Sequence, residues 1–140
     1  MIRRLEEKDI ERVMDIWLKT NKEAHNFIPE QYWDDNYNVV KKMIGNSEVY
    51  IFEDNSNIEG FVGLMENYIA GIFVEKDYQC KGVGRELLDY IKKIKSNLNL
   101  YVYKKNEKAV DFYLREKFLK SEEKTDEYHD EVEYHMVWKS

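Results

Sequence analysis

The chain has 140 residues, which predicts a single domain with enough apolar side chains for one hydrophobic core. Its 22 Lys and Arg residues against 28 Asp and Glu give a net charge of −6, which argues against a nucleic-acid-binding protein, because such proteins need a basic face. No apolar run has the length of a membrane span, and the first residues lack the apolar stretch of a signal peptide. A single cysteine, Cys80, permits no internal disulfide, so we expect a cytoplasmic protein with no membrane partner.

The first third of the chain is predicted to hold one strand and two helices. Residues 2–5 favour a short edge strand. Apolar residues recur at helical spacing over 10–18, with Asp9 as the expected cap or first-turn acid, and again over about 30–45. Gly45-Asn46 is expected to end the second helix in a left-handed turn.

Three strands are predicted next. Residues 49–52 and 58–65 are β-rich and flank the turn-forming residues 54–57, which predicts a hairpin. Residues 68–74 are almost entirely apolar, and a strand of this kind is usually central and covered on both faces.

The remainder alternates helices with strands. A helix is predicted from Gly82, a strand over 98–103, a helix capped by Asn106, and two final strands that begin at Phe118 and cover 132–138. No repeat or linker is present, so the order β-α-α-β-β-β-α-β-α-β-β predicts one α/β domain.

The strand-to-helix turn at Tyr78–Arg85 is the most informative stretch. Glycines at a helix start let an anion approach the free N–H groups, and Lys81 and Arg85 add positive charge. The spacing fits neither a Walker loop nor a dinucleotide fingerprint, which leaves Gln-x-x-Gly-x-Gly over 79–84. From these residues alone, a tight turn without a ligand is the alternative.

With the downstream Asn-x-x-Ala-x-x-Phe-Tyr at 106–113, the sequence resembles the GNAT superfamily of acyl-CoA-dependent N-acetyltransferases, in which both motifs occur in this order. The resemblance covers nearly the whole chain, and one departure is Lys117, where the family often has glycine. It implies one N-acetyltransferase domain over 1–140, with a mixed, mostly antiparallel sheet, a central splay between two parallel strands and about four flanking helices. The following segments are similar to small bacterial members of the YiaC/YjaB type: 16–18, 25–28, 32–33, 60–62 and 72–74.

The resemblance implies that acetyl-CoA is the co-substrate and that no metal is needed. The residues implied to bind acetyl-CoA lie on the third strand, the glycine turn and the last helix: Phe73, Val74, Gln79, Lys81, Gly82, Val83, Gly84, Arg85 and Asn106. Phe73 and Val74 are expected to act through their backbone, beside the pantetheine arm. Asn106 has a plain helix cap as its alternative role.

By the same resemblance, Tyr113 holds the position of the general acid that protonates the departing thiolate. Core packing is its alternative, because Ala109, Phe112 and Tyr113 share one helix face. Glu66 is the candidate general base, with a solvated turn carboxylate as the alternative.

His25 and Trp33 are expected to line the pocket of the amine acceptor, a protein lysine or a small molecule, although His25 also suits a place over the core. The acidic segment 122–131 is interpreted as a solvated loop that attracts cationic amines if it borders that pocket. A monomer or homodimer is expected. The alternative function is a non-catalytic module that senses acetyl-CoA.

Overall fold

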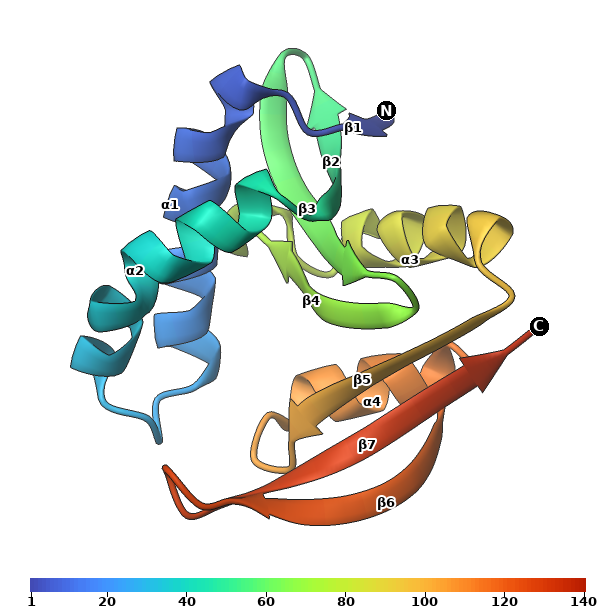
Figure 1. The fold of residues 1–140 in the computed structure, drawn as a ribbon. Coiled ribbons are helices and arrows are strands. Elements are labelled where there is room, and N and C mark those ends of the chain that lie inside the picture. Colours follow the sequence, from blue (N-terminus) through green and yellow to red (C-terminus); the bar gives the residue numbers. More distant parts are fainter.

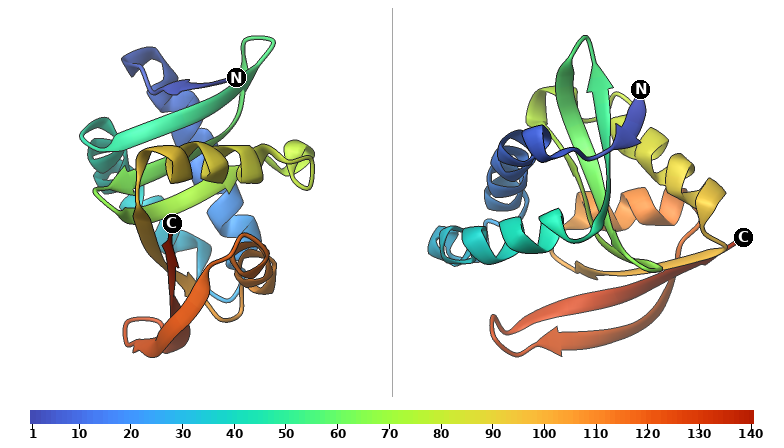
Figure 2. Two further views of the ribbon diagram at one scale, coloured as in Figure 1. Left: turned by 90° about the vertical axis from the view of Figure 1, so that its right-hand side faces the viewer. Right: turned by 45° about the horizontal axis from the view of Figure 1, so that its top comes forward.

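The computed structural model describes residues 1–140 and contains one seven-stranded sheet with helices on both faces. The strands are β1 (Ile2–Arg4), β2 (Glu48–Asp54), β3 (Asn57–Met65), β4 (Tyr68–Val74), β5 (Asn97–Tyr103), β6 (Leu119–Asp126) and β7 (Glu131–Lys139). The helices are α1 (Ile10–Ala24), α2 (Glu30–Gly45), α3 (Val83–Ile94) and α4 (Glu107–Arg115), with single 3₁₀ turns at Glu7–Asp9 and Lys76–Tyr78. Figures 1 and 2 show α1 and α2 on one face of the sheet and α3 and α4 on the other. The predicted element order and mixed sheet are confirmed.

The sheet has the order β1-β2-β3-β4-β5-β7-β6, and every neighbouring pair is antiparallel except β4 and β5. These two parallel strands meet only where Tyr68 pairs with Asn99, and they diverge toward their carboxyl ends (Figure 1). The predicted central splay is therefore present. Because it opens one edge of β4, only Ile69 of this strand is buried, which corrects the expectation of a strand covered on both faces.

Two hydrophobic clusters hold the helices to the sheet. The α3 side packs Leu87, Leu88 and Ile91 against alternate residues of β5, and the α1 side packs Val13, Met14 and Trp17 against β2 and β3. Alternation of buried residues along β5 is what a strand with one core face requires. The two clusters pack against opposite faces of the half of the sheet that contains β4. The open edge of β4 is therefore supported from both faces.

Three local predictions are corrected. The Asp9 carboxylate does not cap α1; it accepts hydrogen bonds from the Glu6 N–H and from Arg3. No positive φ occurs at the end of α2, because Asn46 has a φ of −112° and its N–H bonds to the last carbonyls of the helix. The acidic segment is not a loop: residues 122–126 belong to β6, which pairs with β7 at the edge of the sheet, and only residues 127–130 form a turn.

Candidate functional site

The glycine turn before α3 has the backbone shape that the sequence predicts. Cys80 and Gly82 have φ values of 62° and 90°, so the chain enters the left-handed region twice within three residues. Gly82 occupies the N-cap position of α3, and a Cβ there would meet no atom within 4 Å. The requirement for glycine at this position is therefore one of backbone conformation and not of space.

The N–H groups around this turn are free of protein acceptors. The first helical bond of α3 runs from the Glu86 N–H to the Gly82 carbonyl at 2.9 Å, and no side chain caps the helix. The N–H groups from Cys80 to Arg85 donate to no backbone or side-chain acceptor. Together with the positive end of the helix dipole, this run of donors forms an anion-binding surface.

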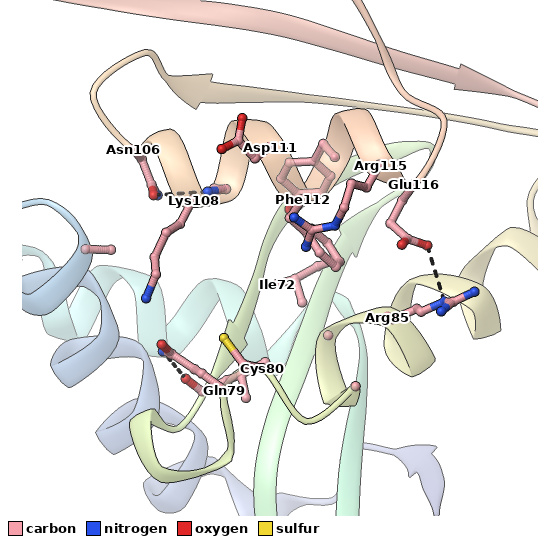
Figure 3. Close-up of a pocket in the computed structure, with 16 residues that line it drawn as sticks. Ile72, Gln79, Cys80, Arg85, Asn106, Lys108, Asp111, Phe112, Arg115 and Glu116 are labelled. Atoms are coloured by element: carbon pink, nitrogen blue, oxygen red, sulfur yellow. Dashed lines mark hydrogen bonds and ion pairs between the residues drawn. The ribbon is translucent and has the colours of Figure 1, made fainter.

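The turn opens onto a cavity that has a volume of about 610 Å³ and lies between α3, α4 and the carboxyl half of β4 (Figure 3). Its lining residues are Ala24, Ile72, Val74, Gln79, Cys80, Gly82, Gly84, Arg85, Asn106, Lys108, Ala109, Asp111, Phe112, Tyr113, Arg115 and Glu116. The site residues predicted from the sequence that it brings together are Val74, Gln79, Gly82, Gly84, Arg85, Asn106 and Tyr113. Val83 is buried just behind the turn. We call this cavity the α3–α4 groove.

Three cations line the α3–α4 groove. Arg85 Nε faces Glu116 Oε1 at 3.8 Å, so this pair joins α3 to α4 across the groove, and Lys108 extends from α4 toward Gln79 (Figure 3). Arg115 is the third. Lys81 does not line the groove, since its Nζ lies 5.9 Å over the Tyr78 ring.

The open edge of β4 offers different backbone groups from those expected. The Glu75 N–H bonds to the Glu59 carbonyl, and hydrogen-bonded pairs alternate along antiparallel strands, so Phe73 turns its N–H and C=O toward Phe61 on β3. The groups of Ile72 and Val74 then face the splay. This corrects the expectation for Phe73, whose ring stacks on Phe61 at 4.9 Å in the α1-side core. The Val74 carbonyl already accepts a bond from Gln79 Nε2 at 2.9 Å.

Tyr113 lines the α3–α4 groove with only 6% of its surface exposed. Its ring packs edge-on against Phe112 and Phe118, so it is part of the core and of the groove lining at once. Burial, with a smaller contribution from Tyr68, raises the pKa of Tyr113 well above its ordinary value. Like an ordinary tyrosine, Tyr113 is protonated at neutral pH. Its hydroxyl donates no hydrogen bond within the protein.

His25 and Trp33 are adjacent, but neither lines the α3–α4 groove. Their rings stack at 5.4 Å, and His25 Nε2 lies 3.3 Å from Asn106 Nδ2, while Asn106 Oδ1 accepts a bond from the Ala109 N–H. Asn106 is thus the helix cap that was predicted, and it also lines the groove. Burial lowers the pKa of His25 to about 4, so the imidazole is neutral at pH 7.

Glu66 lies apart from these residues. It occupies the β3–β4 turn with a φ of 57°, at the opposite end of β4 from the glycine turn, and it lines a separate cavity with Met65 and the end of α2. Glu66 is exposed, and nothing in the structure brings it to the α3–α4 groove. We therefore assign it no role in the chemistry proposed below.

The lining residues that sequence reasoning did not assign to the site include Ile72, Lys108 and Arg115. The sequence did not show which edge of β4 the backbone groups of Ile72 face, because β4 contains a bulge. Gly63 pairs with Gly71 but Leu64 pairs with Ile69, which leaves Ala70 as an extra residue on β4. The two cations could have been found from their i, i+3 and i, i+4 relation to residues of the Asn-x-x-Ala-x-x-Phe-Tyr stretch.

Comparisons with known proteins agree with this geometry. Residues 45–118 match the family model described as an acetyltransferase (GNAT) domain. The peptidyl-lysine N-acetyltransferase YiaC of Escherichia coli is 30% identical over 120 residues, which cover 84% of this chain and 82% of YiaC.

Two solved structures share the fold. The apo form of YjaB from Escherichia coli has a TM-score of 0.86 at 21% identity and covers 99% of this chain and 96% of its own. The PaiA N-acetyltransferase from Thermoplasma acidophilum, solved with coenzyme A, has a TM-score of 0.86 at 19% identity and covers 100% and 98%. No helix of this chain is long and apolar enough to span a membrane. The chain belongs to the GNAT acetyltransferase family and is an acetyl-CoA-dependent N-acetyltransferase.

Proposed function

We propose that this enzyme transfers the acetyl group of acetyl-CoA to the side-chain amine of a protein lysine. The observation that carries the proposal is the run of free N–H groups from Cys80 to Arg85, which opens onto a groove that the nearly buried Tyr113 also lines. An anion site and a proton donor in one groove suit a substrate with a diphosphate and a thioester. The lysine acceptor is supported by YiaC, which is a peptidyl-lysine N-acetyltransferase and matches most of this chain.

In the proposed complex, the N–H groups of Val83, Gly84 and Arg85 hold the diphosphate of acetyl-CoA. Lys108 and Arg115 add positive charge along α4, and the Arg85 guanidinium exchanges its contact with Glu116 for a phosphate oxygen. Both partners of that ion pair remain in the groove, so the exchange needs only a side-chain movement. Gln79 acts indirectly, because its bond to the Val74 carbonyl fixes the turn to β4.

The pantetheine arm is proposed to lie along the open edge of β4, as an added strand would. Ile72 and Val74 supply the backbone groups there, since β5 pairs with β4 only at Tyr68. A backbone N–H on this edge also suits the developing negative charge on the thioester oxygen.

The proposed chemistry is direct transfer. The acceptor lysine arrives as an ammonium ion and first loses one proton to solvent water. The neutral amine then attacks the thioester carbon, a C–N bond forms, the C–S bond breaks, and the thiolate takes the proton of the Tyr113 hydroxyl. The tyrosinate is then reprotonated through the acceptor's released proton. A tyrosine hydroxyl is neutral at pH 7, as a proton donor must be, and burial keeps Tyr113 in that form.

An acceptor panel tests the proposal. Free thiol release from acetyl-CoA is followed with single-lysine peptides, peptides with a free N-terminus, polyamines and small amines, and the products are located by mass spectrometry. We expect lysine-dependent thiol release and a 42 Da increase, the mass of an acetyl group, on lysine. Release with another acceptor class and none with lysine would contradict the lysine assignment, and acetyl-CoA binding without any release would favour the sensor.

We also propose that residues 1–140 act as one N-acetyltransferase domain. The support is that a single sheet joins β1, near the amino end, to β7, near the carboxyl end, through continuous pairing. The cytoplasmic location, the monomeric or homodimeric state and the lack of a nucleic-acid partner stay predictions from the sequence.

A further inference from the structure

The ammonium group of Lys124 lies between a carboxylate and an aromatic face. Its Nζ is 4.1 Å from the centre of the Tyr101 ring and 3.9 Å from Oε2 of Glu133. Glu133 pairs with Tyr103 on β5 and with Lys124 on β6, so these side chains share the sheet face opposite the Leu100–Val102 core. A carboxylate beside the π face of a ring is an arrangement that binds primary ammonium groups.

Glu133 is poorly satisfied for a carboxylate in this position. Its side chain is only 17% exposed, it accepts no hydrogen bond, and Lys124 is its sole ion-pair partner. Burial raises the pKa of Glu133, with Asp126 adding to the same effect. Half-buried carboxylates are ordinarily held by close donors, so Glu133 has capacity for a second, closer cation.

The Lys124 contact is one that another cation can displace. Half of the Lys124 side chain is exposed, and its 3.9 Å separation from Glu133 is too long for a hydrogen bond. Exposed ion pairs of this kind contribute little to stability. The Lys124 ammonium group therefore shows where a cation can lie, although Lys124 itself is only weakly bound there.

This arrangement adjoins the splay where β4 and β5 part. Tyr68, at the one point of contact between these strands, has its ring 6.4 Å from that of Tyr101. Burial, and next the charge of Glu133, raises the pKa of Tyr68, and Tyr68 in turn acts on Tyr113. Through Tyr101, the aromatic face under the Lys124 ammonium group is thus next to Tyr68, the residue at which β4 and β5 part.

The surrounding charge is suited to a cation. Asp126 stands two residues beyond Lys124 on β6 and accepts bonds from the Tyr103 hydroxyl and from His129 Nδ1, both at 2.8 Å. The His129 side chain is 8% exposed, and its Nε2 has no hydrogen-bond partner in the protein. A buried polar nitrogen left without a partner, on a ring that is held by a carboxylate, indicates a region that is completed by another molecule.

We propose that Glu133 and Tyr101 form the subsite that receives the protonated side-chain amine of the acceptor lysine, and that Lys124 occupies this subsite until the acceptor displaces it. The inference rests on the proposed lysine acetyltransferase function. Glu133 here binds and positions the acceptor, and no bond is made or broken at it. The subsite selects amines that are cationic when they arrive.

The test compares two acceptors and three variants by steady-state kinetics at pH 7.5. The first acceptor is a peptide with one lysine between neutral residues, and the second carries an aminooxy side chain at that position, which is uncharged at this pH. Glu133→Gln should raise KM for the lysine peptide about tenfold, because it removes a charged contact. Its KM for the aminooxy peptide and for acetyl-CoA should stay within about twofold of wild type.

Glu123→Gln is the matched control. It removes the same charge from the same hairpin, but Glu123 pairs with Tyr134 and so lies on the other face of the sheet. Its kinetics should equal those of wild type with both peptides. Lys124→Met should lower KM for the lysine peptide about threefold, because the internal competitor is gone. Thermal unfolding of each variant checks that the fold is intact.

Three results would overturn the subsite. These are an unchanged lysine KM in Glu133→Gln, an equal loss with both peptides, and an equal loss in Glu123→Gln. An unchanged KM in Lys124→Met would overturn the occupant assigned to it. If wild type acetylates the aminooxy peptide and no lysine peptide, the lysine acceptor itself is wrong, and that result is distinguishable because it appears before any variant is made.

Discussion

His25 and Asn106, which are 81 positions apart, meet through a contact of 3.3 Å between Nε2 and Nδ2. His25 Nδ1 faces Asn21 Oδ1 at 3.1 Å, so the ring is held on both sides as a neutral imidazole that donates through Nδ1 and accepts at Nε2. The contact joins the end of α1 to the cap of α4, and therefore joins the predicted acceptor side to the α3–α4 groove.

This contact predicts a pH-dependent stability. The folded-state pKa of His25 is about 4, below the ordinary 6.5, so the unfolded state binds the extra proton between these values. The stabilisation is complete above pH 6.5 and is lost as the pH falls toward 4. Between pH 7.5 and 5, we expect His25 to reduce the free energy of unfolding by about 2 kcal/mol. Urea unfolding across this range measures it, with His25→Gln as the comparison. Equal slopes in both proteins would contradict the assignment.

Tyr113→Phe should lower kcat by about 100-fold while the affinity for acetyl-CoA changes less than about threefold, because the hydroxyl is needed to protonate the thiolate and not to bind. The substitution should not destabilise the fold, since the hydroxyl makes no hydrogen bond in the protein. Tyr90→Phe is the control, because Tyr90 packs on Tyr50 on the α3 side, away from the groove lining. A kcat for Tyr113→Phe equal to wild type from pH 6 to 9 would remove the general-acid role.

Gly82→Ala should weaken acetyl-CoA binding by about five- to tenfold, measured by calorimetric titration. The φ of 90° costs an L residue about 1 kcal/mol or more, and relaxing it turns the free N–H groups away from one another. Gly45→Ala is the control. Gly45 ends α2 without a positive φ and has only one neighbour, Ile10 Cδ1 at 4.0 Å, so alanine there should leave binding unchanged and slightly stabilise the fold. Equal affinities for wild type and Gly82→Ala would contradict a binding role for the turn.

Lys117→Gly should stabilise the protein by about 0.5–1 kcal/mol. Lys117 has a φ of 76° just after α4, where the Phe118 N–H bonds to the Tyr113 carbonyl at 2.9 Å and the Lys117 N–H bonds to that of Leu114 at 3.2 Å. This pair of bonds is the Schellman ending that glycine favours. Denaturant unfolding measures the change, and a loss of stability would show that the Lys117 side chain has a role of its own.

The sequence predicted the elements well where periodicity was strong. The bounds of β4 and the start of α3 agree with the prediction to the residue or nearly so, because apolar runs and glycine mark them. Segment 122–126 was predicted as loop from its charge, yet it is an edge strand in which every residue but Asp126 is exposed and whose backbone pairs with β7. Charge reports exposure, and an edge strand is as exposed as a loop.

The parts of the candidate site whose backbone conformation is set by a local motif could be predicted from the sequence. The parts whose position is set by the pairing of distant strands could not. The turn around Gly82 and the cap at Asn106 are local, and both are found as expected. The prediction that the Phe73 backbone faces the cofactor was wrong, because the edge of β4 to which a residue turns its backbone groups depends on the register with β3. The contact of Lys124 with Tyr101 depends on β6 and β5 lying on either side of β7, which no local pattern shows.

Amide hydrogen exchange with and without acetyl-CoA tests the central claim most directly. If the free N–H groups from Cys80 to Arg85 hold the diphosphate, acetyl-CoA should slow exchange of these amides by at least about tenfold, while amides of the β3–β4 turn around Glu66 keep their rates. Unchanged exchange at Cys80–Arg85 under saturating acetyl-CoA would contradict the account.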